Sequence, residues 1–464
     1  MCAKCHDNSK AAQADNWNTM PSRLACGACH DGINFATGAG TTLAGAATGH
    51  VGKAQSNDGT CSLCHGAADI KTYHQTENIT KHNPTIAAGL ATFTYEIKSA
   101  DVNATTNDVT VVFKISKDGT ALTTLPPTGF TGSPGFLLAW AQSQDGITTP
   151  VDYNNLGLTK GDARSVSFAN STISGPDSGG YFTATIASAR GFPVGAKMRA
   201  VALNSYYTQV IPTGNVARHA ISVVKEVTGD TVRRKVVDSD KCANCHEWFE
   251  GHGGSRVYQV QVCVMCHVPA KATSGRGISD TVWNQYATSV GFSAAGLKML
   301  NEWGVSTTAT ERALNLPVTT NNMKDMIHGI HSGRDRVNPF RDARDRTGGT
   351  PAGSTGAITL LDFRRMDFPG IRQNCETCHV AGTYSSVPST ALASTYESID
   401  ATYAAGITGG TATTAMAKAS YAQANNDDKV VSPFAAACVS CHDSVAAQSH
   451  AATQGGMIQV TRGT

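Results

Sequence analysis

Hydrophobic and polar side chains alternate along the middle of the chain with the two-residue period of β-strands. The run 91–98 places Phe93, Tyr95 and Ile97 on one face, and the run 109–116 repeats the pattern. Three further runs, separated by Gly, Pro and Asn turn signals, cover residues 181–187, 198–203 and 220–227. Several short strands joined by such turns predict an antiparallel sandwich or barrel.

The segments on either side, 1–86 and 236–464, show little regular apolar periodicity. Segments so poorly supplied with patterned apolar side chains do not build an ordinary hydrophobic core. We therefore expect short helices and loops there, wrapped around something other than their own side chains.

Composition and charge remove several classes of protein. Only 16% of the 464 residues are charged, and 37 Lys and Arg against 35 Asp and Glu give a net charge of +2 with no basic tract. A nucleic-acid partner is therefore not expected. The most apolar stretch, 135–141, is far shorter than the roughly 18 residues of a membrane span, so no transmembrane segment is expected.

The cysteines carry the clearest chemical signal in the sequence. All 14 of them fall in Cys-x-x-Cys-His pentads, and none is left over. The seven pentads are Cys2/Cys5/His6, Cys26/Cys29/His30, Cys61/Cys64/His65, Cys242/Cys245/His246, Cys263/Cys266/His267, Cys375/Cys378/His379 and Cys438/Cys441/His442. This spacing is the attachment signal for c-type haem.

The chemistry requires this spacing. Two thiols three positions apart lie on one side of a helical turn and can add to the two vinyl groups of a haem, and the adjacent histidine supplies the proximal imidazole to iron. Zinc ribbons pair their dithiols without a fixed histidine after each pair, and a redox dithiol protein needs only one pair. The sequence therefore predicts seven covalent haem c groups.

Eight of the 15 histidines lie outside the pentads, close to one for each haem, which favours bis-histidine ligation. Two of them, His328 and His331, are spaced i, i+3 on a predicted helix, so that one face directs both imidazoles to two neighbouring haems. The six predicted sixth ligands are His50, His74, His252, His328, His331 and His450. His82 and His219 adjoin the β segment, and a solvent-facing role is the alternative for both.

The predicted fold class is multidomain, with two haem-packed, mostly irregular or short-helical multihaem c domains flanking an antiparallel β domain. The three haem pentads of residues 1–86 form the first domain, residues 87–235 the β domain, and the four pentads of residues 236–464 the last. The β domain is expected to serve as a scaffold or docking surface.

The chain begins with Cys2 directly after Met1 and shows neither a signal peptide nor a lipid-anchor cysteine. A c-type cytochrome is exported before its haems are attached. We therefore predict that the sequence is an internal fragment of a longer exported protein, whose lipoprotein anchor lies in a missing N-terminal part.

The order of haem group, β module and haem group, with Gly251-His252-Gly253 between two pentads and the segment 326–331 after them, resembles the outer-membrane decahaem cytochromes of the OmcA/MtrC type. That family alternates two Greek-key, split-barrel-like β domains with two pentahaem domains. The resemblance implies that this chain carries seven of ten haems and supports the six predicted sixth ligands. It also implies that one distal ligand among the first three haems comes from the missing N-terminal part, which leaves His82 spare. The cysteine pair that members often carry in the β domain is absent here.

The resemblance implies electron transfer at the extracellular face of the cell outer membrane. Electrons would come from an outer-membrane porin-cytochrome or another redox partner and pass through bis-histidine haems to ferric minerals, metal chelates or flavins. This describes an electron-transfer protein rather than a substrate-specific enzyme, with terminal ferric reductase activity left open. Two alternatives remain. A multihaem reductase of nitrite, hydroxylamine or a sulfur oxyanion needs an open sixth iron position, and a subunit of a polymeric cytochrome filament takes distal ligands from its neighbours.

Overall fold

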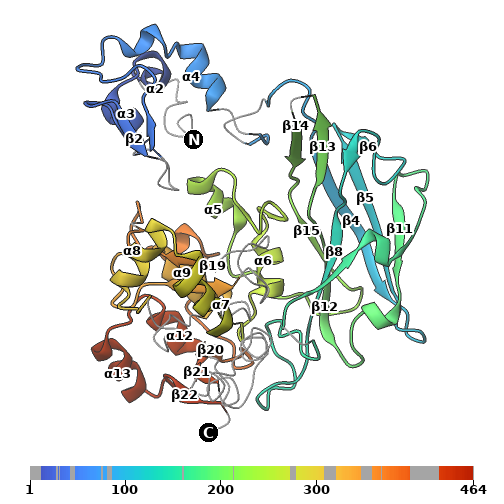
Figure 1. Cartoon of the computed structure of the whole chain (residues 1–464). Coiled ribbons are helices and arrows are strands. Elements are labelled where there is room, and N and C mark those ends of the chain that lie inside the picture. Colours follow the sequence, from blue (N-terminus) through green and yellow to red (C-terminus); the bar gives the residue numbers. More distant parts are fainter. Residues whose placement is uncertain are drawn as a thin grey trace. The chain divides into compact units, whose positions relative to one another are not determined.

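The computed structural model describes residues 12–27, 30, 32–41, 47–74, 77–80, 86–158, 161–212, 214–271, 278, 280–307, 320–345, 358–366, 368–397 and 428–462. Two compact units divide the chain: Met1–Thr92 with Ala243–Phe249, and Phe93–Cys242 with Glu250–Thr464. The second unit contains a β region and a C-terminal region, both drawn in Figure 1.

The β region of the second unit consists of antiparallel sheets. One sheet has the order β10 (Thr172–Ser174), β11 (Phe182–Ile186), β5 (Val109–Lys117), β4 (Phe93–Val102), with β6 (Thr120–Ala121) also paired to β5. A second has the order β15 (Val223–Glu226), β12 (Lys197–Asn204), β8 (Gly135–Ala141), β9 (Arg164–Ser167). A third contains β14 (Gly214–Arg218), β13 (Tyr207–Ile211) and β7 (Phe130–Thr131).

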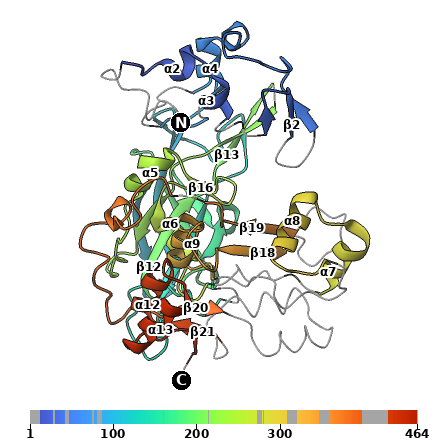
Figure 2. The same ribbon diagram turned by 90° about the vertical axis from the view of Figure 1, so that its left-hand side faces the viewer.

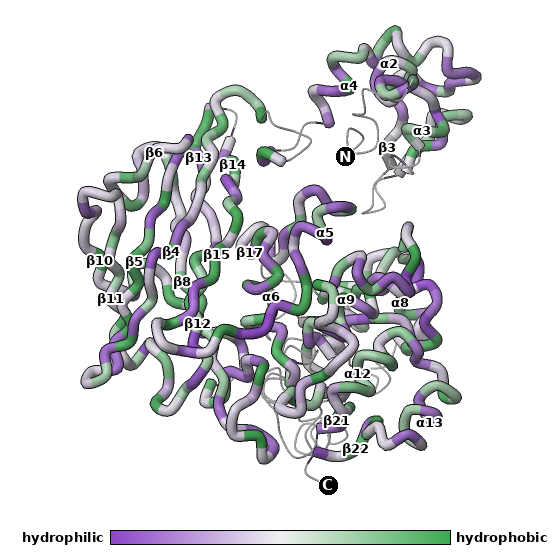
Figure 3. Tube along the Cα trace, turned by 180° about the vertical axis from the view of Figure 1, so that it is seen from behind, coloured by the Kyte–Doolittle hydropathy of each residue, from purple (hydrophilic) through white to green (hydrophobic). Residues whose placement is uncertain are grey.

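The alternating sequence pattern explains the core of this region. Along β5, every second side chain from Val109 to Ile115 is fully buried, and the tube changes between green and purple along such strands (Figure 3). Phe113 of β5 packs edge-on against Phe136 of β8 at 5.3 Å between ring centroids, which joins the two larger sheets face to face. The predicted antiparallel β module is therefore confirmed.

The strands predicted over 181–187 and 198–203 correspond to β11 and β12. The strand predicted over 220–227 is shorter, since β15 starts only at Val223. The backbone N–H of Ser222 instead donates to the carbonyl of Val257, outside this sheet.

The C-terminal region is built from short helices and small antiparallel pairs. The helices are α5 (Ser239–His246), which crosses into the first unit, α6 (Val260–Cys266), α7 (Asp280–Gln285), α8 (Ala294–Glu302), α9 (Met323–His331), η6 (Cys375–Thr377), α12 (Pro433–Val439) and α13 (Val445–Thr453). The strands are β16 (Glu250–Gly251) with β17 (Arg256–Val257), β18 (Arg341–Asp345) with β19 (Ile358–Asp362), and β20 (Ser394–Glu397) with β21 (Lys429–Val431) and β22 (Val460–Thr461).

Helix α9 confirms the helix predicted for His328 and His331. Its N-cap is Asn322, whose side-chain oxygen accepts the backbone N–H of Asp325 at 3.0 Å. An N-cap of this type satisfies one of the free N–H groups of the first turn. The helix ends at His331, so both histidines lie in its last turn.

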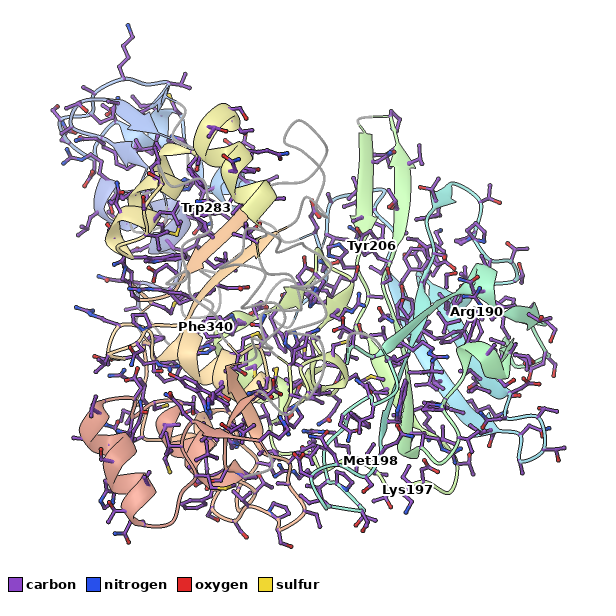
Figure 4. The ribbon with its side chains drawn as sticks, turned by 60° about the horizontal axis from the view of Figure 1, so that its bottom comes forward. Arg190, Lys197, Met198, Tyr206, Trp283 and Phe340 are labelled. Atoms are coloured by element: carbon purple, nitrogen blue, oxygen red, sulfur yellow. The ribbon has the colours of Figure 1, made fainter. Side chains whose placement is uncertain are left out.

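The expectation that the haem-bearing segments lack an apolar core does not hold everywhere. Trp283 of α7 and Leu300 of α8 are fully buried in a cluster with Ile278, Val282 and Val305. Figure 2 shows α7, α8 and the hairpin β18–β19 together at one side of the second unit, and Figure 4 labels Trp283 there. The periodicity of such short helices is too brief to be recognised in sequence.

The first unit is small and open. Its elements are α2 (Asn16–Thr19), α3 (Arg23–Gly27), β1 (Ile33–Asn34), β2 (Ala39–Thr41), β3 (Ala47–Gly49), η1 (Cys61–Leu63) and α4 (Ala67–Tyr73). Arg23 joins α3 to the segment before η1, because its Nε bonds to Asp58 Oδ1 at 2.7 Å and its Nη1 donates to the Gln55 carbonyl. Between residues 12 and 80, no side chain whose exposure the structure describes is buried.

Candidate haem-binding sites

The pentad residues that the structure describes lie on short helical turns. In five of them the backbone N–H of the histidine donates to the carbonyl of the first cysteine at 2.8–2.9 Å; these are the pentads that end at His30, His65, His267, His379 and His442. This i→i+4 bond is the α-helical one and brings the histidine back over the first cysteine. Cys2, Cys5, His6 and Cys29 lie outside the described residues.

In the pentads that end at His65 and His379 the short turn is a 3-10 helix. Helices η1 and η6 each end one residue before the second cysteine, so Cys64 and Cys378 occupy C-cap positions with φ angles of −115° and −124°. Such turns are tighter than α-helical turns and rarely extend beyond 3–4 residues. Both cysteines of each pentad thus still belong to one short helical turn.

Protein side chains leave the second cysteines of three pentads at least partly exposed. Cys245 lies inside α5 as predicted, but its side chain is exposed, as is that of Cys64, and Cys378 is only half-buried. The physical reason is that few apolar side chains surround these short turns, so protein atoms alone do not cover the thiols. Their role as haem attachment points stays a prediction.

None of the described cysteines forms a disulfide with another. The described cysteines that form no disulfide are Cys26, Cys61, Cys64, Cys242, Cys245, Cys263, Cys266, Cys375, Cys378, Cys438 and Cys441. A disulfide framework is thus not what these cysteines build in the described part of the chain. Free thiols are the groups that thioether attachment to haem requires.

Four pentad histidines each face a histidine from outside the pentads. In the first unit, His30 faces His74 with 6.1 Å between ring centroids, and His50 faces His65 with 6.2 Å.

The second unit repeats this arrangement. His252 faces His267 at 6.0 Å, and His328 faces His379 at 5.9 Å. Four of the six histidines predicted as sixth ligands are thus brought opposite a predicted proximal ligand.

These separations match the room that one iron ion needs between two imidazoles. A ring nitrogen binds a first-row metal at about 2.0–2.1 Å, and the ring centroid lies about 1.1 Å further, so two rings on opposite sides of one iron have centroids about 6.3 Å apart. Two imidazoles in direct contact would not need to keep that separation in four independent places. The residues present therefore fit a six-coordinate haem at each pair.

Hydrogen bonds hold these rings with Nε2 available for a metal. Nδ1 of His74 lies 2.7 Å from the Ile70 carbonyl, and Nδ1 of His267 lies 2.6 Å from that of Asn321. A carbonyl oxygen only accepts, so Nδ1 must carry the proton and Nε2 keeps its lone pair. This arrangement around a ligating histidine is the usual one in metal sites.

The pair formed by His328 of α9 and His379 after η6 is also kept neutral. Burial is the main cause that lowers the pKa of His328 to about 4, and the neighbouring His379 lowers it further. Burial likewise lowers the pKa of His379. Both imidazoles are therefore unprotonated at neutral pH, the state that iron binding requires.

The other predicted ligands occupy different surroundings. His331 bonds through Nδ1 to the Ile327 carbonyl at 2.9 Å, and its ring meets Phe368 edge-on. His450 is exposed on α13. His82 lies outside the described residues, whereas His219 follows β14 and bonds through Nδ1 to Glu250.

Sequence reasoning missed the groups that orient these imidazoles. The acceptors for His74 and His267 are main-chain carbonyls of Ile70 and Asn321, and a backbone carbonyl leaves no signal in a sequence. For His328 the partner is the Ser440 hydroxyl, 2.9 Å from Nδ1. Ser440 stands inside a pentad, and that position is the only hint the sequence offers.

Within the described ranges, no helix combines the length and apolar character needed to cross a membrane.

The family model for outer membrane cytochrome MtrC/MtrF-like, domains II/IV, matches residues 234–464, about half of the chain. The chain belongs to this family.

Solved structures similar to this MtrC/MtrF-like chain include MtrC from Shewanella baltica OS185 and the outer membrane decaheme cytochrome OmcA. The first is 14% identical with a TM-score of 0.47, over 98% of this chain and 60% of that chain. The second is 16% identical with a TM-score of 0.42, over 99% of this chain and 56% of that chain. The MtrC/MtrF-like chain thus spans less than two thirds of either structure, and no curated protein matches it.

Proposed function

We propose that this chain transfers electrons outside the cell through c-type haems with two histidine ligands each. The observation that carries the proposal is the set of four imidazole pairs, with 5.9–6.2 Å between ring centroids. Each pair combines a histidine from a haem-attachment pentad with one from elsewhere in the chain. Membership of an outer-membrane cytochrome family supports the same conclusion.

The residues of the chain have three tasks in this proposal. The pentad cysteines anchor each haem covalently and so fix the spacing between neighbours. The paired histidines would hold the iron of each haem between them, which would leave no open position for a substrate. Haem supplies one-electron exchange between ferric and ferrous iron, and the protein sets its potential by ligand identity, hydrogen bonds and burial.

In the proposed arrangement, residues 1–86 bind three haems and residues 236–464 bind four. Residues 87–235 form the β domain between them in the sequence. Seven haems would be present, with His331 and His450 as further sixth ligands. The proposed location is the extracellular face of the outer membrane. The proposed partners are an outer-membrane porin-cytochrome that delivers electrons, and ferric minerals, metal chelates or flavins that receive them.

The test starts from the full chain carrying its haems. His328→Ala should leave one haem five-coordinate, so that one ferric haem becomes high-spin and its ferrous form binds carbon monoxide. His328→Met should keep that haem six-coordinate and raise its reduction potential, as methionine does in cytochromes. His50→Ala provides a second test in the other unit, at a histidine that is half-buried like His328.

Lys197→Ala, an exposed substitution on β12, serves as the matched control and should leave every haem in the spin state that it has in the unsubstituted chain. The unsubstituted chain should reduce ferric citrate or a flavin and should not turn over nitrite or hydroxylamine. A high-spin haem in the unsubstituted chain together with nitrite turnover would contradict the proposal in favour of a reductase.

A further inference from the structure

His252 is presented by a tight hairpin with an unusual backbone. Strands β16 and β17 pair Glu250 with Val257, and the loop between them carries positive φ angles of 57° at His252, 64° at Gly253 and 81° at Gly254. A residue with a side chain adopts this left-handed conformation rarely, and it persists where the surroundings hold it. The hairpin therefore needs external support to keep His252 opposite His267.

The β region provides that support. The backbone N–H of Ser205 donates to the Ser255 carbonyl at 2.9 Å, and that of Ser222 donates to the Val257 carbonyl at 3.1 Å. These two bonds attach the second half of the hairpin to residues that adjoin β12 and β15. The loop is thus part of the interface between the β region and the haem-bearing region within one compact unit.

His219 supports the first half of the hairpin. Its Nδ1 lies 2.7 Å from Oε2 of Glu250, in the strand that leads into the positive-φ loop. Its ring packs against Tyr206, labelled in Figure 4, with 4.7 Å between ring centroids. The ring also lies directly against the loop, because a Cβ added to Gly254 would collide with His219 Nε2.

These surroundings favour a positioning role for His219 over iron ligation. A ligating imidazole leaves Nε2 open toward the porphyrin. Protein atoms instead enclose Nε2 of His219, which has no hydrogen-bond partner within the described ranges. The side chain of His219 is 13% exposed, whereas that of its partner Glu250 is 33% exposed.

The β region also contacts the opposite side of the same candidate site. The buried side chain of Asn155 donates from Nδ2 to the carbonyl of Met265 at 2.7 Å. Met265 lies between Cys263 and Cys266, inside the pentad that ends at His267. The segments that carry both axial imidazoles are therefore held by one scaffold.

We propose that His219 and Glu250 form a positioning pair through which the β domain fixes the distal histidine of the haem attached at Cys263 and Cys266. This inference rests on the proposed bis-histidine function and adds a role for the β domain beyond that of a scaffold. By holding the imidazole of His252, the pair would set the axial bond and hence the reduction potential of this one haem.

The test compares two neighbouring glycines in the haem-loaded full chain. Both have positive φ, so an alanine strains the backbone at either position. An added Cβ at Gly253 meets nothing within 4 Å, whereas at Gly254 it collides with the His219 ring. Gly254→Ala should therefore make one ferrous haem per chain bind carbon monoxide or shift its midpoint potential, and Gly253→Ala, which adds backbone strain without the collision, should have a clearly smaller effect.

His219→Ala should shift the potential of the same haem, because the hairpin loses its bond at Glu250 and its packing at Gly254. The double variant His219→Ala/Gly254→Ala should have the midpoint potential of His219→Ala rather than the sum of the two shifts. In the double variant, no His219 ring remains for the Cβ of residue 254 to meet. Low-spin signals from the other haems check that every variant is folded.

His252→Ala separates this inference from the function on which it rests. If His252→Ala creates a carbon-monoxide-binding haem but His219→Ala leaves its potential unchanged, the positioning role is overturned and the bis-histidine function stands. Equal behaviour of the two glycine variants overturns it too. If His252→Ala creates no such haem, the bis-histidine assignment fails at this site.

Discussion

The β region and the first unit differ in what fills their interiors. In the β region, Phe113, Phe136 and Trp140 are fully buried, and apolar side chains from two sheets form a continuous core. In the first unit, no side chain described between residues 12 and 80 is buried. The β region can therefore be stabilised by its own side chains, whereas the first unit needs another source of buried surface.

The C-terminal region lies between these extremes. Its apolar clusters around Trp283 and around Ala436 are small and local. Under the proposed function, porphyrin rings supply the missing buried surface, so stability in the haem-bearing regions depends on haem attachment. The β region, which has its own apolar core, is expected to be stable without haem.

The largest effect is expected from removing haem. In the full chain produced without haem attachment, amide protons in β5, β8 and β12 should stay protected from exchange, because those strands belong to an apolar core. Amides of η1 and α4, which have no buried side chains, should exchange freely. Hydrogen exchange followed by mass spectrometry compares the two sets, and the haem-loaded chain is the reference. Equal protection in both sets would contradict the claim that only the β region has a core that is independent of haem.

A second prediction concerns the core of the β region. Phe113→Ala should lower the free energy of unfolding of this region by about 3–5 kcal/mol, the usual cost of a phenylalanine-sized cavity. Val194→Ala is the control, since Val194 is 86% exposed, and it should stay within about 0.5 kcal/mol of the parent. Denaturant titration followed by hydrogen exchange of the β5 and β8 amides measures both, and an equal loss for the two variants would refute the assigned core.

A third prediction uses the ion pair that joins β12 to the turn after β15. Arg199 donates to Asp230 from Nε at 2.9 Å, from Nη2 at 2.7 Å and from its backbone N–H at 2.7 Å. Asp230→Asn should cost about 1.5–3 kcal/mol at neutral pH, the range for hydrogen bonds to charged groups. Thermal unfolding of the haem-loaded chain measures it, with Asp101→Asn on β4 as a control for loss of one carboxylate.

The pH dependence of this pair has a defined sign. Burial alone would raise the pKa of Asp230, but the bonds and charge of Arg199 outweigh it and lower the pKa below its ordinary value. The stabilisation is therefore complete above the ordinary carboxyl pKa of about 3.9 and is lost as pH falls through the folded-state pKa. The difference between Asp230→Asn and the parent should shrink in that acid range, and a constant difference would contradict it.

The smallest effect is expected at the surface of the same sheet region. Lys114 forms an ion pair with Glu96 at 3.0 Å, and the Glu96 side chain is 48% exposed. Exposed pairs of this kind contribute little because water and salt screen them. Lys114→Ala should leave the melting temperature unchanged at physiological salt. A loss comparable to that of Asp230→Asn would show that burial does not decide these contributions.

Parts of the molecule with local causes could be predicted well. The strands β4, β5, β11 and β12 follow from alternation along the sequence, because a strand exposes successive side chains to opposite faces. The helix of His328 and His331 follows from their spacing. The cluster around Trp283 was missed because its members come from several short elements, none long enough to show a period.

The pairing of histidines could not be predicted from spacing. His74 follows His65 by nine residues, yet it faces His30, and His65 faces His50 instead. His252 follows His246 by six residues, yet it faces His267. Short separations along the chain do not place two rings on opposite sides of a flat prosthetic group, so long-range packing chooses the partner.

Local sequence is enough to predict haem attachment at the pentads and the helical turn on which a pentad histidine returns to its first cysteine. Attachment chemistry and an i→i+4 hydrogen bond both act within five residues. The sequence also determined which segments could form a sandwich with an apolar core. Only the tertiary structure decided which imidazoles face each other and that His219 of the β region supports the hairpin of His252. Those contacts join residues far apart in the chain, and they depend on how the elements pack rather than on any local pattern.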